Sequence, residues 1–378
     1  MARRVWLGCV LMLIVLGAPI GQARADQVVD GRFGPGALYR LVRPANWNGS
    51  LVVYAHGFVS PDEPVGITPD AEQVIGLLAP QGFAVAVSSF SANGWVIKDG
   101  AQRTHQLLGL FTSKFGRPET VYVGGASMGG LIAVKLLETY PGTYAGALVA
   151  CGATGGTGRL ADYYAHTRVL FDFFYPNVLP GSAADLPAGT DLTQHIVLPA
   201  LAAMSANVLP ALQLAAIDQT PLPFATPAEL VESIVSALTG NAGFLAQSRA
   251  LTKGHPAFDN RDTTYSSAIL PAPLLQAIND GVERFAAAPS ALRAFDHNYD
   301  PSGDLRVPML MLSNARDPVV PGFNQTSYAA AVDANGAAGL LVQREVPAFG
   351  HCVFTPAELA FAFSDLVLWV QFGIKPSS

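Results

Sequence analysis

The stretch TVYVGGASMGG, residues 120–130, decides the fold of this chain. Its first four residues are β-branched or aromatic, which is typical of a short buried strand. Apolar residues then recur at helical spacing from Leu131 until Pro141 ends the pattern. Between them, residues 125–129 fit the motif G-x-S-x-G, in which small neighbours let a tight strand-to-helix turn close and the helix N-terminus faces the serine. The motif alone also fits an ordinary Gly-rich turn, but the flanking strand and helix favour Ser127 as a nucleophile.

Outward from this stretch, short β-rich runs alternate with longer helical patterns. Such alternation predicts an α/β fold with a mostly parallel sheet that helices cover on both faces. The expected strands are residues 51–54, 83–87, 120–123, 147–150, 309–312 and 340–346. The expected helices are residues 71–78, 102–115, 131–140 and 324–332, and a last one that begins at Thr355.

The alternation stops between Gly155 and Asp304, where the chain is rich in Ala, Leu and Pro. Helical patterns there cover residues 197–214, interrupted by Pro199 and Pro210, and residues 227–238. We expect a helical cap or lid, residues 155–304, inserted between two core strands. The core then consists of residues 26–154 and 305–378.

The composition excludes some classes of protein. Of the 378 residues, 50 % are hydrophobic and only 13 % are charged, which is the opposite of a disordered chain. The formal net charge is −6 and no cluster of Lys and Arg is present, so nucleic acid is not an expected partner.

The first 25 residues have the pattern of a secretory signal. Arg3 and Arg4 precede an apolar run from Val5 to Ile20, and Ala23-Arg24-Ala25 provides a small-x-small cleavage site. A membrane helix is the competing interpretation, but Gly17 and Pro19 shorten the run below the roughly 20 residues that a span needs. We therefore expect cleavage after Ala25, a secreted or periplasmic protein, and no membrane span in the mature chain.

Two further motifs follow strands near the C-terminus. Asp317 lies in the segment 313–321, directly after the strand 309–312, where an acid can accept a hydrogen bond from a histidine. An aspartate before proline is also common in turns, and Asp300 and Asp304 are alternatives, but both precede this strand and are expected at its opposite end. His351, in Phe349-Gly350-His351-Cys352, follows the last strand and can reach the serine as its base.

The other histidines fit a catalytic role less well. His56 follows the first expected strand and is interpreted as structural. No histidine pair has the spacing of a metal motif such as H-E-x-x-H, so we predict neither a catalytic metal nor a cofactor. The remaining ones lie in an expected helix or in the lobe: His105, His166, His195, His255 and His297.

Removal of the signal leaves two cysteines, Cys151 and Cys352. Cys151 follows the strand 147–150, and Cys352 follows His351 in a loop that must fold over the same edge of the sheet. Export to an oxidising compartment favours a disulfide between them. Two buried free thiols are the alternative, because an unpaired cysteine behaves as a small hydrophobic residue.

The order Ser127, Asp317, His351, with His56-Gly57 upstream, resembles the α/β-hydrolase superfamily, and in particular its secreted serine esterases and lipases with a large helical cap. The resemblance covers the whole mature chain. It implies that the backbone N–H groups of Phe58 and Met128 form an oxyanion hole. His-Gly at a strand end is by itself also compatible with a plain turn.

The leading hypothesis is a secreted serine hydrolase that cleaves carboxylic esters, small or polymeric, through an acyl-enzyme. A proline-directed or other serine peptidase on the same fold is the first alternative, although no anchoring motif for a peptide terminus is recognisable in the lobe. A binding protein that has lost catalysis is the second. Acyl and alcohol specificity and oligomeric state are not encoded in these motifs.

Overall fold

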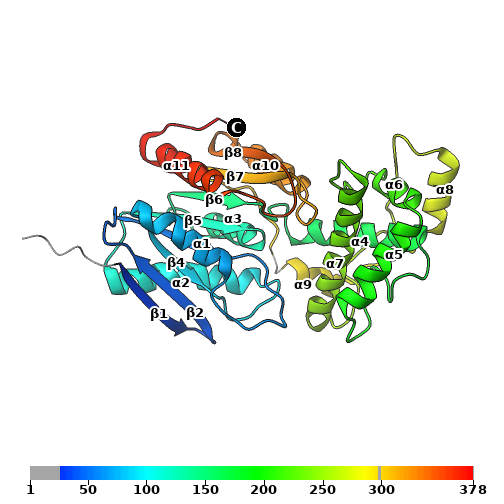
Figure 1. Cartoon of the computed structure of the whole chain (residues 1–378), viewed down its shortest axis with the longest axis horizontal. Coiled ribbons are helices and arrows are strands. Elements are labelled where there is room, and N and C mark those ends of the chain that lie inside the picture. The colour runs from blue at the N-terminus through cyan, green and yellow to red at the C-terminus, as the bar shows by residue number, and fades with distance from the viewer. Residues whose placement is uncertain (1–25, 297–298, 378) are drawn as a thin grey trace, which may run out of the picture.

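The computed structural model describes residues 26–296 and 299–377, and the expected secretory signal lies outside them. One sheet of eight strands runs through the described part (Figure 1), in the order β1-β2-β4-β3-β5-β6-β7-β8. The strands are β1 (Gln27–Phe33), β2 (Ala37–Arg43), β3 (Ser50–Ala55), β4 (Ala84–Ser88), β5 (Thr120–Ala126), β6 (Gly146–Ala150), β7 (Met309–Arg316) and β8 (Leu341–Phe349).

The sheet is parallel from β4 to β8 and antiparallel at its N-terminal edge. β1 and β2 form a hairpin, and β2 pairs antiparallel with β4. The other neighbours pair in parallel, which confirms the α/β fold and the six strands expected from the sequence. The hairpin was not expected, because β1 is mostly exposed and has no apolar run.

Helices cover both faces of the sheet. Packed against one face are α2 (Ile97–Phe115), α3 (Met128–Thr139) and α10 (Phe323–Ala334), with Leu107, Leu131 and Tyr328 in a shared core. Against the other face lie α1 (Pro69–Leu78) and α11 (Pro356–Phe372), with Leu78 and Phe363 buried (Figure 1). α11 begins at the expected place with a capping box, because Thr355 and Glu358 bond to each other's backbone N–H groups.

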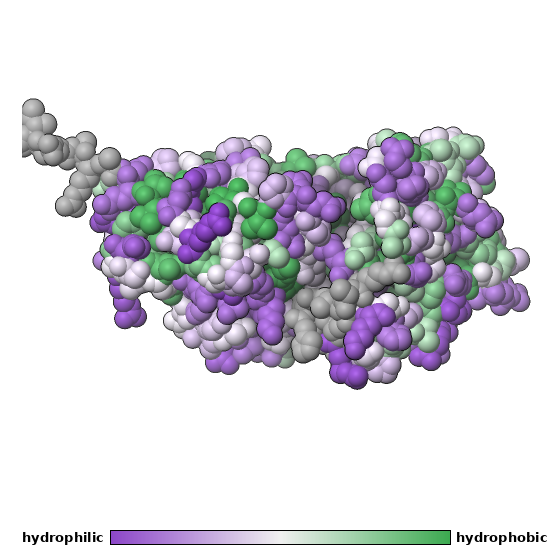
Figure 2. Space-filling model, turned by 90° about the horizontal axis from the view of Figure 1, so that it is seen from below, coloured by the Kyte–Doolittle hydropathy of each residue, from purple (hydrophilic) through white to green (hydrophobic). Residues whose placement is uncertain are grey.

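A group of helices between β6 and β7 lies to one side of the sheet (Figure 1). Pro199 and Pro210 do not interrupt a helix there. Pro210 stands in the first turn of a helix, where the missing N–H costs no hydrogen bond. Pro199 lies within a continuous helical segment, just after the π-helical turn Thr193–Val197. Figure 2 shows polar and apolar residues interspersed over the core and this group on the face seen from below. The helices are α4 (Thr157–Phe174), α5 (Leu198–Ala206), α6 (Leu209–Ala215), α7 (Pro227–Thr252), α8 (Ala272–Gly281) and α9 (Pro289–Asp296).

Among the described residues, no single helix has the length and apolar character to cross a membrane. Two successive helical segments, Thr193–Ala206 and Leu209–Ala215, reach this length and apolar character only when they are taken together, and they are bent by 109° relative to each other.

Candidate active site

The candidate residues lie where successive parallel strands end. Ala126, the last residue of β5, pairs with Ala150 of β6, and Ala150 pairs with Leu312 of β7. The carboxyl ends of these strands therefore lie side by side at one edge of the sheet. The segments that leave this edge carry Ser127 after β5, Cys151 after β6, Asp317 after β7 and His351 after β8.

Ser127 occupies the tight turn between β5 and α3. Its backbone has φ 55° and ψ −122°, a conformation that non-glycine residues rarely adopt, and its N–H donates to Ala150 O at 3.0 Å. The turn closes only because its neighbours are small. A Cβ on Gly125 would collide with the carbonyl of Gly129, and a Cβ on Gly129 would collide with the carbonyl of Ala55. The glycines of the motif are thus required by backbone contacts.

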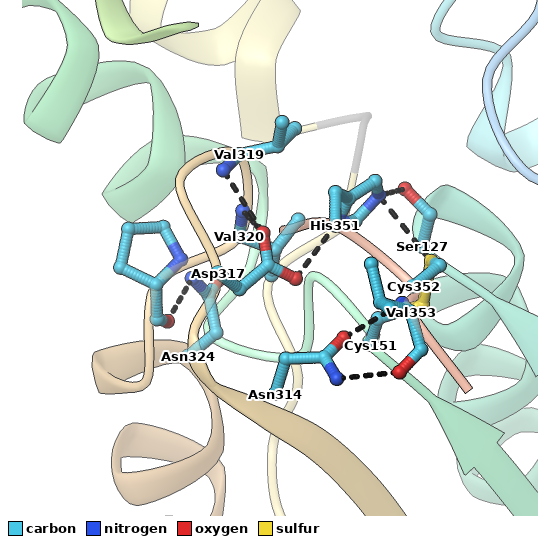
Figure 3. A network of polar contacts seen from close by, with 12 residues as sticks. Ser127, Cys151, Asn314, Asp317, Val319, Val320, Asn324, His351, Cys352 and Val353 are labelled. Atoms are coloured by element: carbon cyan, nitrogen blue, oxygen red, sulfur yellow. Dashed lines mark hydrogen bonds and ion pairs between the residues drawn. A yellow bond between two sulfur atoms is a disulfide. The ribbon is translucent and has the colours of Figure 1, made fainter. Parts of the chain in front are cut away.

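Ser127, His351 and Asp317 form one chain of hydrogen bonds (Figure 3). His351 Nε2 lies 2.8 Å from Ser127 Oγ, and His351 Nδ1 lies 2.7 Å from Asp317 Oδ2. With Nδ1 protonated toward Asp317, Nε2 is free to accept the proton of the serine hydroxyl. The fold thus brings together three side chains from segments up to 224 residues apart in sequence.

Asp317 is held as well as buried. Its side chain is 1 % exposed, and its Oδ1 accepts hydrogen bonds from the backbone N–H groups of Val319 and Val320, each at 2.9 Å. These bonds direct Oδ2 toward His351 (Figure 3). A buried carboxylate with three hydrogen bonds is suited to orienting an imidazole.

Asn314, in β7, fixes the loop that carries His351. Its side-chain amide donates to Val353 O and its Oδ1 accepts from Val353 N, both at 2.9 Å. Gly350, with φ 122°, adds a bond from its N–H to Arg316 O at 2.9 Å. Sequence reasoning missed Asn314, although an asparagine at the end of an apolar strand is a signal for a buried polar contact.

Cys151 and Cys352 form a disulfide, with Cα atoms 5.3 Å apart, as the sequence favoured. Together with His351, these cysteines place ligand-type atoms within 4.8 Å of one another. Sulfur atoms in a disulfide are not thiolates, and the thiolate is the form that binds metal ions. This cluster therefore gives no support for a metal centre.

The structure places the loop 56–58 beside Ser127. A Cβ on Gly57 would lie 3.4 Å from Ser127 Cβ, so the backbone of this loop approaches the serine closely. Met128 is the first residue of α3, and its N–H is among the helix donors that lack an intrahelical partner. The Phe58 side chain is 44 % exposed. Met128 thus adjoins Ser127 in the chain, and Phe58 follows Gly57, the residue whose backbone approaches Ser127.

His56 is buried. Its ring stacks on Phe90 with centroids 3.8 Å apart, and its Nδ1 lies 2.7 Å from Gly57 O. Burial lowers the pKa of His56, and bonding to the Gly57 carbonyl opposes this only in part. These contacts fit a structural role.

The two alternative acids lie elsewhere. Asp304 forms an exposed ion pair with Arg306. Asp300 accepts a hydrogen bond from Gly158 N at 3.2 Å, at the start of α4. Its expected place, at the opposite end of β7, was wrong, because the returning chain passes the start of α4 before it reaches the sheet.

The other histidines have partners away from this chain of bonds. His105 stacks on Tyr140, and His166 contacts the Tyr265 hydroxyl. His195 bonds to Asp191 N, and His255 is exposed. His297 lies outside the described residues.

Comparisons with known proteins identify the fold. No protein-family model matches the sequence, and no curated protein matches it either. Solved structures do match. Feruloyl esterase B from Aspergillus oryzae aligns with 92 % of this chain and 81 % of its own, at 13 % identity and a TM-score of 0.56. An esterase from the same organism aligns with 93 % and 80 %, at 16 % identity and 0.49. A carboxyl esterase from Bacillus coagulans aligns with 93 % and 99 %, at 13 % identity and 0.45.

The sheet order, the serine turn and the match to feruloyl esterase B agree with one another. The chain has the α/β-hydrolase fold. At these identities the comparison extends to the fold and not to the substrate.

Proposed function

We propose that this chain is a secreted serine hydrolase that cleaves carboxylic esters through a Ser127-His351-Asp317 triad. The observation that carries the proposal is the continuous chain of hydrogen bonds from Ser127 Oγ through His351 to Asp317 Oδ2, with distances of 2.8 Å and 2.7 Å. This arrangement of nucleophile, base and acid is the one by which a serine hydroxyl is activated as a nucleophile.

Acylation starts at the serine. Ser127 Oγ attacks the ester carbonyl carbon while His351 Nε2 takes the hydroxyl proton, and Asp317 stabilises the resulting imidazolium. The carbonyl oxygen becomes an oxyanion, which the N–H groups of Phe58 and Met128 bind. When the tetrahedral intermediate collapses, the alcohol leaves with the proton from His351, and the acyl group stays on Ser127.

Deacylation repeats these steps with water. His351 removes a proton from a water molecule, which attacks the acyl carbonyl at the same oxyanion hole. The Ser127–acyl bond then breaks, His351 returns the proton to Ser127 Oγ, and the carboxylic acid is released.

Several lobe residues that could anchor a peptide terminus have other partners. Arg284 donates to the carbonyls of Asn260, Thr263 and Asn279. Arg261 pairs with Asp259, and Glu229 pairs with Arg316. This favours ester over peptide substrates.

We further propose that residues 155–304 act as a cap beside the site, and that the chain is exported. The lobe leaves the sheet at the carboxyl end of β6, beside the strand ends that carry the triad, and its helices α4 and α7 contact the end of β7 and the segment after it. The disulfide supports export, because such bonds persist mainly in oxidising compartments.

The test uses the protein from Asp26 onward with paired chromogenic substrates. A series of p-nitrophenyl esters from acetate to long-chain and aromatic acids is compared with a proline p-nitroanilide, and a phosphonate probe reports on serine reactivity. We expect ester turnover and labelling in the wild type. Ser127→Ala abolishes labelling and lowers turnover on the order of 10⁶-fold while the fold is retained.

Three outcomes contradict the proposal in different ways. Faster cleavage of the anilide than of every ester favours the peptidase. Absence of both turnover and labelling favours a binding protein. Ester turnover in Ser127→Ala above a hundredth of the wild-type rate excludes Ser127 from the mechanism.

A further inference from the structure

The lobe contacts the segment that carries Asp317 at two points. This segment, Arg316–Val320, is called the acid loop below. From α4, the Tyr164 hydroxyl donates a hydrogen bond to Val319 O at 2.7 Å. From the start of α7, Glu229 accepts hydrogen bonds from the Arg316 guanidinium at 3.0 and 3.4 Å.

The contact with Tyr164 acts on the peptide group that holds the carboxylate. Val319 C=O and Val320 N–H belong to one planar peptide unit, in which they point in opposite directions. Tyr164 binds the oxygen side of this unit, and Asp317 Oδ1 binds its N–H side at 2.9 Å. A rotation of the peptide that breaks one bond therefore weakens the other. The hydroxyl of Tyr164 thus bears directly on the orientation of Asp317.

The fold makes room for Tyr164 to reach the loop. Its side chain is 3 % exposed, and its ring crosses α7 at Gly240, where a Cβ would lie 2.6 Å from the ring. Burial, and secondarily the charge of Asp317, raise the pKa of Tyr164 far above its usual value. The hydroxyl therefore remains protonated and serves as a donor.

Glu229 is bound from both sides. It caps α7, because its carboxylate accepts from Ala225 N at 2.6 Å while its own N–H donates to Thr226 Oγ1. Desolvation opposes ionisation, but these bonds and Arg316 lower the pKa of Glu229 overall. Arg316 in turn accepts the bond from Gly350 N, next to His351. The ion pair therefore connects the lobe to the acid loop. Through the Arg316 carbonyl it also connects the lobe to the loop that carries His351.

We propose that Tyr164 and Glu229 are positioning residues through which the lobe holds Asp317 and His351 in line with Ser127. This inference rests on the function proposed above. It assigns the lobe a share of the catalytic rate, beyond any effect of covering the substrate.

Tyr164→Phe is the first test, and Tyr163→Phe is its matched control. Tyr163 is the neighbouring tyrosine on α4, and its buried hydroxyl has no hydrogen-bond partner among the described residues. Loss of one hydrogen bond to the acid loop should lower kcat about three- to tenfold. We expect KM to be unchanged, the rate of phosphonate labelling to fall by the same factor, and Tyr163→Phe to match the wild type.

Glu229→Gln is the second test, and Glu358→Gln is its matched control. Both glutamates accept a backbone N–H from a residue just before their own helix, but Glu358 lies at the start of α11 and bonds to Thr355. Glu229→Gln should lower kcat about two- to fivefold, as expected for a partly exposed ion pair, and Glu358→Gln should not. Added salt should reduce kcat in the wild type and have less effect in Glu229→Gln.

The readouts separate this inference from the proposed function. A wild-type kcat in both Tyr164→Phe and Glu229→Gln overturns the positioning role, even where Ser127→Ala abolishes activity. An equal fall of kcat in Tyr163→Phe also overturns it, because the effect would then come from packing of α4. A fall in melting temperature with unchanged kcat and labelling rate assigns the two contacts to stability alone and counts against the inference.

Discussion

Asn314 and Val353 exchange two hydrogen bonds, so that one side-chain amide of β7 binds both backbone groups of a residue in the loop after β8. Asn314 is 1 % exposed and lies three residues before Asp317. The strand that carries the acid therefore also fixes the loop that carries the base. The relative position of Asp317 and His351 depends on this contact.

Asn314→Ala should reduce both stability and rate. Removal of the amide leaves the N–H and C=O of Val353 without partners, at a cost of about 1–3 kcal/mol in the free energy of unfolding. Because the loop with His351 is then less restrained, kcat should fall as well. Denaturant unfolding and ester kinetics measure the two effects, and a lost stability with an unchanged kcat would show that the loop is fixed by other contacts.

Asp317→Asn should leave the structure intact and lower kcat by about 10⁴-fold, because an amide cannot stabilise the imidazolium and promotes the wrong tautomer of His351. Asp304→Asn is the control, since Asp304 forms an exposed ion pair with Arg306. The two variants are compared by ester turnover at saturating substrate. Equal rates in both would exclude Asp317 as the triad acid.

Gly129→Ala should prevent normal folding. A Cβ at this position would meet the carbonyl oxygens of Ala55 and His56, so α3 and β3 would have to separate. We expect a loss of about 3 kcal/mol or more in the free energy of unfolding. Gly109→Ala in α2 is the control, because a Cβ there meets no atom within 4 Å and alanine favours a helix by about 1 kcal/mol. Thermal unfolding of both variants checks the difference in sign.

His166 should make the protein less stable in acid. Burial, with a contribution from Arg284, lowers the pKa of His166 to about 4, against 6.5 for an ordinary histidine. Between these values the unfolded chain binds a proton that the folded chain does not. The free energy of unfolding therefore falls as the pH decreases from 6.5 to 4, by at most about 1.4 kcal/mol per pH unit.

The variant His166→Asn isolates this contribution. It removes the titrating group, so its free energy of unfolding should depend less on pH over the same range, whatever its absolute stability. Denaturant curves at several pH values between 7 and 4 provide the slopes. Parallel slopes for the two proteins would contradict the prediction.

The sequence predicted the features that depend on local pattern. The glycine pattern predicted the serine turn, because backbone contacts at this turn exclude larger residues. The apolar runs predicted where the strands end. Asp317, His351 and the two cysteines were placed correctly at one edge because parallel strands align their carboxyl ends.

Features that depend on distant contacts were not predictable. Helix α7 was expected to end near Leu238 but continues to Thr252. Gly240 lies inside this helix without ending it, and its lack of a side chain leaves space for the Tyr164 ring. The bond from Tyr164 to Val319 joins residues 155 apart in sequence. No local sequence pattern predicts such a pair, because neither Tyr164 nor Val319 differs from the typical residues of its own helix or loop.

The disulfide has a consequence for the integrity of the molecule. Cys151 precedes the lobe and Cys352 follows it, so the bond closes a covalent ring of the chain that contains every residue of the lobe. A protease that cuts the lobe once opens this ring without releasing a fragment. The cut protein would migrate as one species on a non-reducing gel and as two after reduction. In surroundings that contain proteases, a nicked molecule would thus stay in one piece, with both stumps of the lobe still joined to the sheet.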